Sequence, residues 1–156
     1  MTQGPAEREL RAEATIEATP DEVWAVLSDL GRMPELSTEL VTMLPLRRGG
    51  LRIGQQYLGI NRRKWVLWPT RSTVVALEHA RRLAWHTASS GATWIYELTP
   101  SNTGTTVVHR RPVPGGLTLL SRLAAPLLVG GSARHADELE GHLGQTLARL
   151  KAAVEG

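Results

Sequence analysis

Six short segments rich in apolar and β-branched residues follow one another in the middle of the chain, separated by only a few turn residues. Connections this short force neighbouring strands to run antiparallel, because a parallel crossover needs a dozen or more residues. Together with an alternating apolar and polar segment at 10–18, they predict a seven-stranded sheet that is wide enough to curl. The six segments cover residues 40–47, 54–62, 65–77, 82–89, 92–99 and 104–112.

Helical signals flank this meander on both sides. The run Thr19-Pro20-Asp21-Glu22 offers a threonine N-cap, a proline in the first turn and a glutamate at N3, so it predicts a helix start. That helix should end at Gly31, and residues 33–37 predict a second short helical turn. From 132 to 154, apolar residues recur every three or four positions, which predicts a long C-terminal helix with one apolar face. This apolar stripe consists of Leu139, Leu143, Leu147, Leu150 and Val154.

Composition narrows the class of protein. A chain of 156 residues suits one domain, here expected to span 1–156, and the absence of cysteine excludes disulfides and thiolate chemistry. The N-terminal residues carry charges where a secretory signal needs an apolar run, and the longest apolar run is far shorter than the roughly 20 residues of a membrane helix. We therefore expect a cytoplasmic protein without stable membrane insertion. The arginines occur as scattered short pairs, which argues against nucleic acid as a partner.

Four segments resemble the START/Bet v1-like (SRPBCC) superfamily, in particular its polyketide cyclase/dehydrase-like proteins. The resemblance implies an α+β helix-grip fold, in which a curved seven-stranded antiparallel sheet wraps around a long C-terminal helix and two short helices follow the first strand. It also implies a ligand held between sheet and helix, without implying one reaction or a cofactor. The segments are IEATPDEVWAVLSD (16–29), GINR (59–62), RLAW (82–85) and WIYELTP (94–100) with GTTV (104–107).

The chain departs from this family in the segment after the first helix. Members often carry a tryptophan after the proline there, whereas this sequence reads Met33-Pro34-Glu35-Leu36-Ser37. An aromatic cavity wall is therefore not expected at this position.

Alternation along the strands predicts which side chains face the interior, because successive side chains of a strand point to opposite sides. In the segment 92–99, Trp94 and Tyr96 share the more apolar face. In the last strand both faces carry a valine, and the family register favours His109 inward with Arg111 near an opening. The full ligand-binding set predicted in this way is Tyr57, Asn61, Trp68, Thr70, Trp85, Thr87, Trp94, Tyr96, His109 and Arg111.

Two interpretations of these aromatic residues stay open. Tryptophan and tyrosine on the inner face of a sheet often form ordinary core. The chain has no phenylalanine, however, so its aromatic interior brings indole N–H and phenol O–H groups that need partners when buried. A wet or ligand-filled interior would supply them.

Catalytic and metal-binding patterns are weaker. His109 is the candidate general base, since imidazole titrates near neutrality, but a hydrogen-bonded structural histidine fits the same position. His135, Glu138 and His142 share one face of the last helix at i, i+3 and i+7. That spacing is loose for zinc and equally fits a solvated face, so no metal is predicted.

Three functions follow from these observations. The leading one is binding of a small hydrophobic or aromatic ligand, such as a polyketide-, lipid- or quinone-like molecule, in an internal cavity. The second is a polyketide cyclase or dehydratase that uses cavity polar residues for proton transfer. The third is a protein- or membrane-interaction module acting through the apolar segment 117–129, which also suits a lid over the cavity. A homodimer is compatible with each of them.

Overall fold

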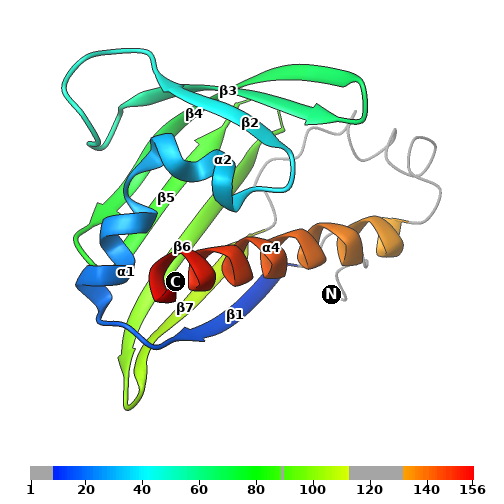
Figure 1. Ribbon diagram of the computed structural model, residues 1–156. Helices are drawn as coiled ribbons and strands as arrows, with labels where there is room; N and C mark the ends of the chain where they lie inside the picture. Colours follow the sequence, from blue (N-terminus) through cyan, green and yellow to red (C-terminus); the bar gives the residue numbers. More distant parts are fainter. Residues whose placement is uncertain (1–8, 89, 113–131) are drawn as a thin grey trace, which may run out of the picture.

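The computed structural model describes residues 9–88, 90–112 and 132–156, with side chains of the last helix described from residue 137 (Figure 1). It contains one seven-stranded sheet in which every neighbouring pair is antiparallel. The strand order is β1-β7-β6-β5-β4-β3-β2. The strands are β1 (Leu10–Ile16), β2 (Leu40–Pro45), β3 (Gln56–Arg63), β4 (Val66–Glu78), β5 (Arg82–Thr87), β6 (Ala92–Ser101) and β7 (Gly104–Arg111).

The first two strands of the sequence lie at opposite edges of the sheet. β1 pairs with β7, so that Leu10 opposes Arg111 and Ile16 opposes Thr105. At the other edge, β2 pairs with β3 alone among the described strands. The connection between β1 and β2 contains α1 (Pro20–Leu27), the short 3-10 helix η2 (Leu30–Arg32) and α2 (Met33–Leu36), which carry the chain from one edge to the other. The predicted seven-stranded antiparallel sheet with two short helices after the first strand is confirmed.

Helix α1 begins as its capping signal predicts. The Thr19 hydroxyl accepts a hydrogen bond from the Glu22 backbone N–H at 3.2 Å, and Pro20 occupies the first helical position. The expected end at Gly31 was wrong, because α1 stops at Leu27 with Ser28 as its C-cap. The Ser28 hydroxyl donates to the Trp24 carbonyl at 2.6 Å and so satisfies a carbonyl group in the last turn.

The long helix α4 (Ser132–Glu155) lies across the concave face of the sheet, against β1 and β7, with α1 and α2 on the same side (Figure 1). Its C-terminal half supplies Leu147 and Leu150 to the main core. There they join Ile16, Leu27 and Val107, all fully buried. The core therefore fills one end of the space between sheet and helix. Within the described ranges, no helix is long and apolar enough to cross a membrane.

Candidate ligand-binding pocket

The other end of this space is hollow. A pocket of about 350 Å³ lies between the concave face of β2–β7, the middle of α4 and the connection from α2 to β2. Nine of the ten side chains that the sequence predicted for a ligand site line it. They are Asn61, Trp68, Thr70, Trp85, Thr87, Trp94, Tyr96, His109 and Arg111.

Tyr57 is the exception. It lies on the predicted face of β3, opposite Ser72, but its residue is only 6% exposed and packs into the main core. Burial raises the pKa of its phenol above the usual value. Alternation predicted the correct face of the strand, whereas the position along the strand decided that this ring fills core rather than lining the pocket.

Aromatic rings form a continuous wall in the pocket. Tyr96 and His109 oppose each other in the β6–β7 register, and their rings stack with centroids 3.8 Å apart and planes within 7°. Trp85 lies 5.6 Å from Tyr96, and Trp94 lies 6.1 Å from His109. The guanidinium carbon of Arg111 lies 5.1 Å from the centroid of Trp94, within the range of a cation–π contact. Flat aromatic ligands are suited to stack against such a wall.

His109 is held in one tautomer. Its Nδ1 lies 3.0 Å from the carbonyl oxygen of Ile95. A carbonyl only accepts hydrogen bonds, so Nδ1 carries the proton and Nε2 keeps a free lone pair. Burial lowers the pKa of His109 to about 4, and the backbone hydrogen bond offsets only part of this effect. At neutral pH the ring is therefore uncharged and offers Nε2 as an acceptor.

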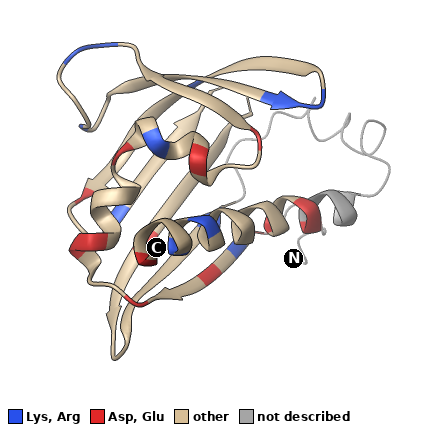
Figure 2. Ribbon diagram, in the orientation of Figure 1, with Lys and Arg blue, Asp and Glu red and all other residues tan. Residues whose placement is uncertain are grey.

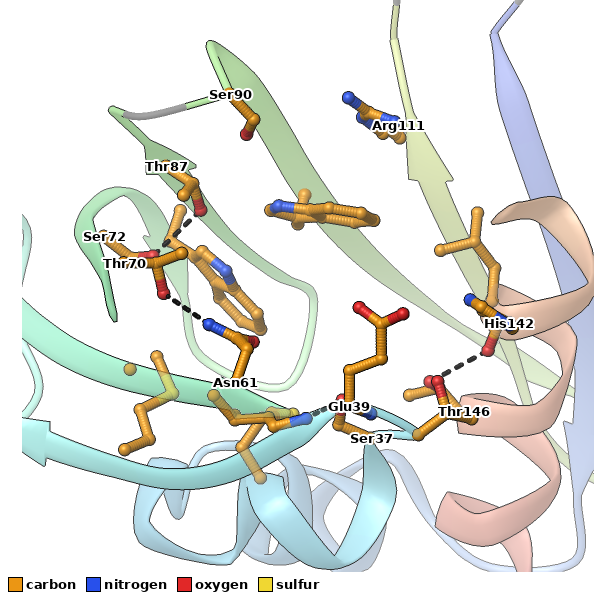
Figure 3. A pocket seen from close by; sticks show the side chains of 18 of the residues that line it. Ser37, Glu39, Asn61, Thr70, Ser72, Thr87, Ser90, Arg111, His142 and Thr146 are labelled. Carbon is orange, nitrogen blue, oxygen red and sulfur yellow. Dashed lines mark hydrogen bonds between the residues drawn. The ribbon is translucent and has the colours of Figure 1, made fainter. Parts of the chain in front are cut away.

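Hydroxyl and amide groups on β3, β4 and β5 line another part of the pocket (Figure 3). The Ser72 and Thr87 hydroxyls are 2.9 Å apart across β4 and β5. Asn61 Nδ2 donates to the Thr70 hydroxyl at 3.1 Å. Gly59 opposes Thr70, and its missing side chain leaves the room that the Thr70 hydroxyl occupies. The pocket thus combines apolar walls with a few placed polar groups, as small-molecule sites do.

The sequence matches the profile of the family described as polyketide cyclase/dehydrase and lipid transport over residues 7–155. The chain belongs to this family. A comparison with curated proteins finds no match. The family assignment confirms the resemblance to polyketide cyclase-like proteins and supports a ligand-binding or cyclase role.

Solved structures share the fold of this polyketide cyclase/dehydrase family member. The KanY protein has a TM-score of 0.71 at 22% identity, over 99% of this chain and 100% of its own. A polyketide cyclase-like protein from Corynebacterium glutamicum has a TM-score of 0.65 at 21% identity, over 99% and 94%. The di-domain aromatase/cyclase StfQ of the steffimycin pathway has a TM-score of 0.74 at 16% identity, over 94% of this chain but 50% of its own. These likenesses confirm the helix-grip architecture.

In this family member, helix α4 roofs the pocket with part of its predicted apolar stripe, and it adds two polar residues that the predicted ligand-binding set did not include. His142 and Thr146 line the pocket beside Leu139 and Leu143. The solvated face considered for His142 was therefore wrong, while Glu138 is exposed. The sequence did contain the signal, since His142, Leu143 and Thr146 follow Leu139 at i+3, i+4 and i+7 and so share one helix face with it. The side chain of His135 lies outside the described residues, and no metal-binding group of three side chains occurs among those described.

The rim of the pocket carries charge. Arg111 is half-buried at the end of β7, burial lowers its guanidinium pKa, and its Nε has no hydrogen-bond partner among the residues that the structure describes. Across the pocket, the carboxylate of Glu39 points toward the middle (Figure 3). Sequence alternation could not predict Glu39, because it precedes β2 in a connection without strand periodicity. The lid segment 117–129 falls outside the described residues.

Proposed function

We propose that the chain is one domain, spanning 1–156, that binds a small aromatic or hydrophobic molecule in this pocket. The observation that carries the proposal is the pocket's lining, which combines a stacked aromatic wall with a few hydroxyl and amide groups. Its volume of about 350 Å³ falls within the range of roughly 300–1,000 Å³ that small-molecule sites occupy. The family name covers both polyketide cyclases and lipid transport, so polyketide-, lipid- and quinone-like ligands are the classes to test.

The polar atoms narrow the choice among these classes. His109 presents an unprotonated Nε2 from within the aromatic wall, which favours a ligand with a phenol or enol hydroxyl. The Arg111 guanidinium at the rim favours an oxygen with partial negative charge. A hydroxylated polycyclic aromatic, such as a hydroxyanthraquinone, meets both requirements and stacks on Trp94.

Fluorescence titration with such a hydroxyanthraquinone tests the proposal. We expect the ligand to quench tryptophan emission saturably, and Trp94→Leu to weaken binding about tenfold because a stacking partner worth roughly 1 kcal/mol or more is lost. Trp65→Leu is the matched control, since Trp65 is 90% exposed and does not line the pocket. No saturable quenching across polyketide-, lipid- and quinone-like probes, or equal loss in both variants, would contradict the proposal.

A polyketide cyclase or dehydratase is the second candidate, and the fixed tautomer of His109 favours it. His109 lines the pocket, so its unprotonated Nε2 is available to accept a proton from a bound chain, and positioned proton transfer contributes roughly 10²–10⁴ in rate. The pKa of about 4, however, makes this imidazole a weak base. Binding is therefore the better supported function.

His109→Asn separates the two candidates. The Asn amide can still donate to the Ile95 carbonyl, but no ring nitrogen remains to take a proton. A cyclase should lose turnover of a poly-β-ketone substrate more than a hundredfold while its affinity changes little. A binding protein shows no turnover before or after the substitution, and that result would contradict the cyclase hypothesis.

A further inference from the structure

Although Arg and Lys are spread along the whole chain, net positive charge is concentrated in one stretch that lacks acidic residues. Residues 40–77, which form β2, β3 and nearly all of β4, contain seven Arg and Lys residues and no Asp or Glu. Since the whole chain has a formal charge of +3, the remaining residues carry a net charge of −4. All seven cations of this stretch are exposed. Figure 2 shows Lys and Arg at the far end of the β3–β4 hairpin, with Asp and Glu along the helices.

The same stretch holds every large hydrophobic residue that is exposed among those the structure describes. Eight such residues lie between Val41 and Val75. The densest group is at the end of the β3–β4 hairpin, where Trp65 is 90% exposed, Val66 59% and Leu67 63%. Residues 62–67 form the hairpin tip. Exposed apolar side chains beside unopposed cations mark a surface that meets a partner.

The hairpin tip is a defined structure. Lys64 and Trp65 form a two-residue turn in which Lys64 has φ of 58°, and Arg62 Nε donates to the Lys64 carbonyl at 2.7 Å. Arg62 pairs with Leu67 and Arg63 pairs with Val66, so each face of the ribbon carries one cation and one aliphatic side chain. Trp65 projects at the end. This arrangement suits insertion of the tip end-on into an interface rather than packing of one face against a flat protein surface.

We propose that the hairpin tip docks on the surface of an anionic phospholipid bilayer. Trp65, Val66 and Leu67 enter the headgroup region, while the three adjacent cations pair with lipid phosphates. Tryptophan flanked by cations is the side-chain combination that prefers a membrane–water interface. Valine and leucine do not stack on nucleic-acid bases, and a symmetric contact between two copies would bring like charges together. A lipid surface therefore fits the tip better than either of these partners.

Docking would bring the pocket to the membrane. Asn61 and Trp68 form the next pair along the hairpin, directly behind the tip, and both line the pocket. A molecule leaving the bilayer would reach the pocket without a long path through water. Docking itself needs no pocket ligand, so it stands or falls separately from the proposed function.

Co-sedimentation of the full chain with phospholipid vesicles tests this proposal. We expect binding to vesicles that contain phosphatidylglycerol and little binding to pure phosphatidylcholine. Raising the salt from about 0.1 M to about 1 M should release the protein, because the Debye length falls from about 10 Å to about 3 Å. Failure to sediment with anionic vesicles at the lower salt would overturn the proposal. So would binding to a single-stranded oligonucleotide that displaces the protein from vesicles.

Matched variants locate the contact. Arg63→Gln should weaken vesicle binding about fivefold, the effect expected of one cation at an anionic surface. Arg81→Gln removes another exposed cation, in the β4–β5 connection, and should change binding less than twofold. Trp65→Ser should abolish most binding, while Trp65→Phe should keep binding but lose the quenching of tryptophan by brominated lipids. Equal effects of Arg63→Gln and Arg81→Gln, or unchanged binding in Trp65→Ser, would overturn the assignment to the hairpin tip.

Discussion

His109 illustrates how neighbours decide the chemistry of one residue. The β6–β7 register places it against Tyr96, the Ile95 carbonyl holds its Nδ1 proton, and the surrounding protein removes it from water. Desolvation disfavours the charged ring, and this lowers its pKa to about 4. Burial also raises the pKa of Tyr96 well above its usual value, so both stacked rings are neutral over the physiological range. The pocket wall is therefore an uncharged surface.

This pKa shift predicts a pH dependence of stability. Between pH 6.5 and pH 4 the unfolded chain binds a proton on His109 that the folded chain does not, so the free energy of unfolding falls as the pH falls through this window. His109 alone should make it about 2 kcal/mol lower at pH 5 than at pH 7. Urea unfolding of the natural chain and of His109→Asn at both values measures the difference. Identical pH dependence in the two chains would contradict the prediction.

Gly59 gives a second prediction for a single residue, because a side chain there would clash with its neighbours. A Cβ at this position would lie 2.7 Å from the Thr70 hydroxyl oxygen and 3.1 Å from Leu40 Cδ1. Gly59→Ala must therefore displace Thr70 and break its hydrogen bond with Asn61, at a cost of about 1–3 kcal/mol in unfolding free energy. In a Thr70→Ala background, Gly59→Ala should lower the free energy of unfolding by less, because the hydroxyl that it would displace is absent. Additive costs in this double-mutant cycle would show that the two positions do not meet.

At the scale of elements, helix α4 has two roles along its length. Leu147 and Leu150 anchor its C-terminal half in the core, whereas Leu139, His142 and Thr146 in its middle cover the pocket. One apolar stripe serves both, because the sheet beneath it is filled with side chains at one end and hollow at the other. The helix thereby ties the stability of the core to the position of the pocket roof.

The N-cap of α1 gives a prediction for a single element. Thr19→Ala leaves the Glu22 N–H without its side-chain acceptor and should lower the free energy of unfolding by about 1 kcal/mol. Thr19→Ser keeps the acceptor and should restore most of the loss. Chemical denaturation of the three chains measures both effects. A loss in Thr19→Ser as large as that in Thr19→Ala would show that the cap is not responsible.

At the scale of the whole molecule, a ligand in the pocket contacts both the sheet and α4 and binds only the folded chain. At a ligand concentration of 100 Kd it should add about 2.7 kcal/mol to the unfolding free energy. For a chain of this length that corresponds to a rise in Tm of roughly 5–10 °C. Differential scanning calorimetry of the natural chain and of Trp94→Leu at one ligand concentration measures the rise. The variant should show a smaller rise, and equal shifts would place the ligand elsewhere.

The sequence by itself determined the elements and the faces of the strands. Short connections required neighbouring strands to be antiparallel, and alternation placed Trp94 and Tyr96 on the inner face of the sheet. The capping signal at Thr19 correctly predicted the start of α1. These features depend on residues close together in the chain, whose geometry obeys local rules. The family segments extended that information to the helix-grip architecture.

Only the tertiary structure decided which inward residues line the pocket and how they behave. Tyr57 and Asn61 share a strand face, yet one fills core and the other lines the pocket, because burial depends on which side chains from the rest of the fold pack against each position. His142 entered the site through the position of α4, and His109 lost its ordinary pKa through groups distant in sequence. Periodicity determines the direction of a side chain, whereas its burial, partners and charge are set by elements that meet it only after folding.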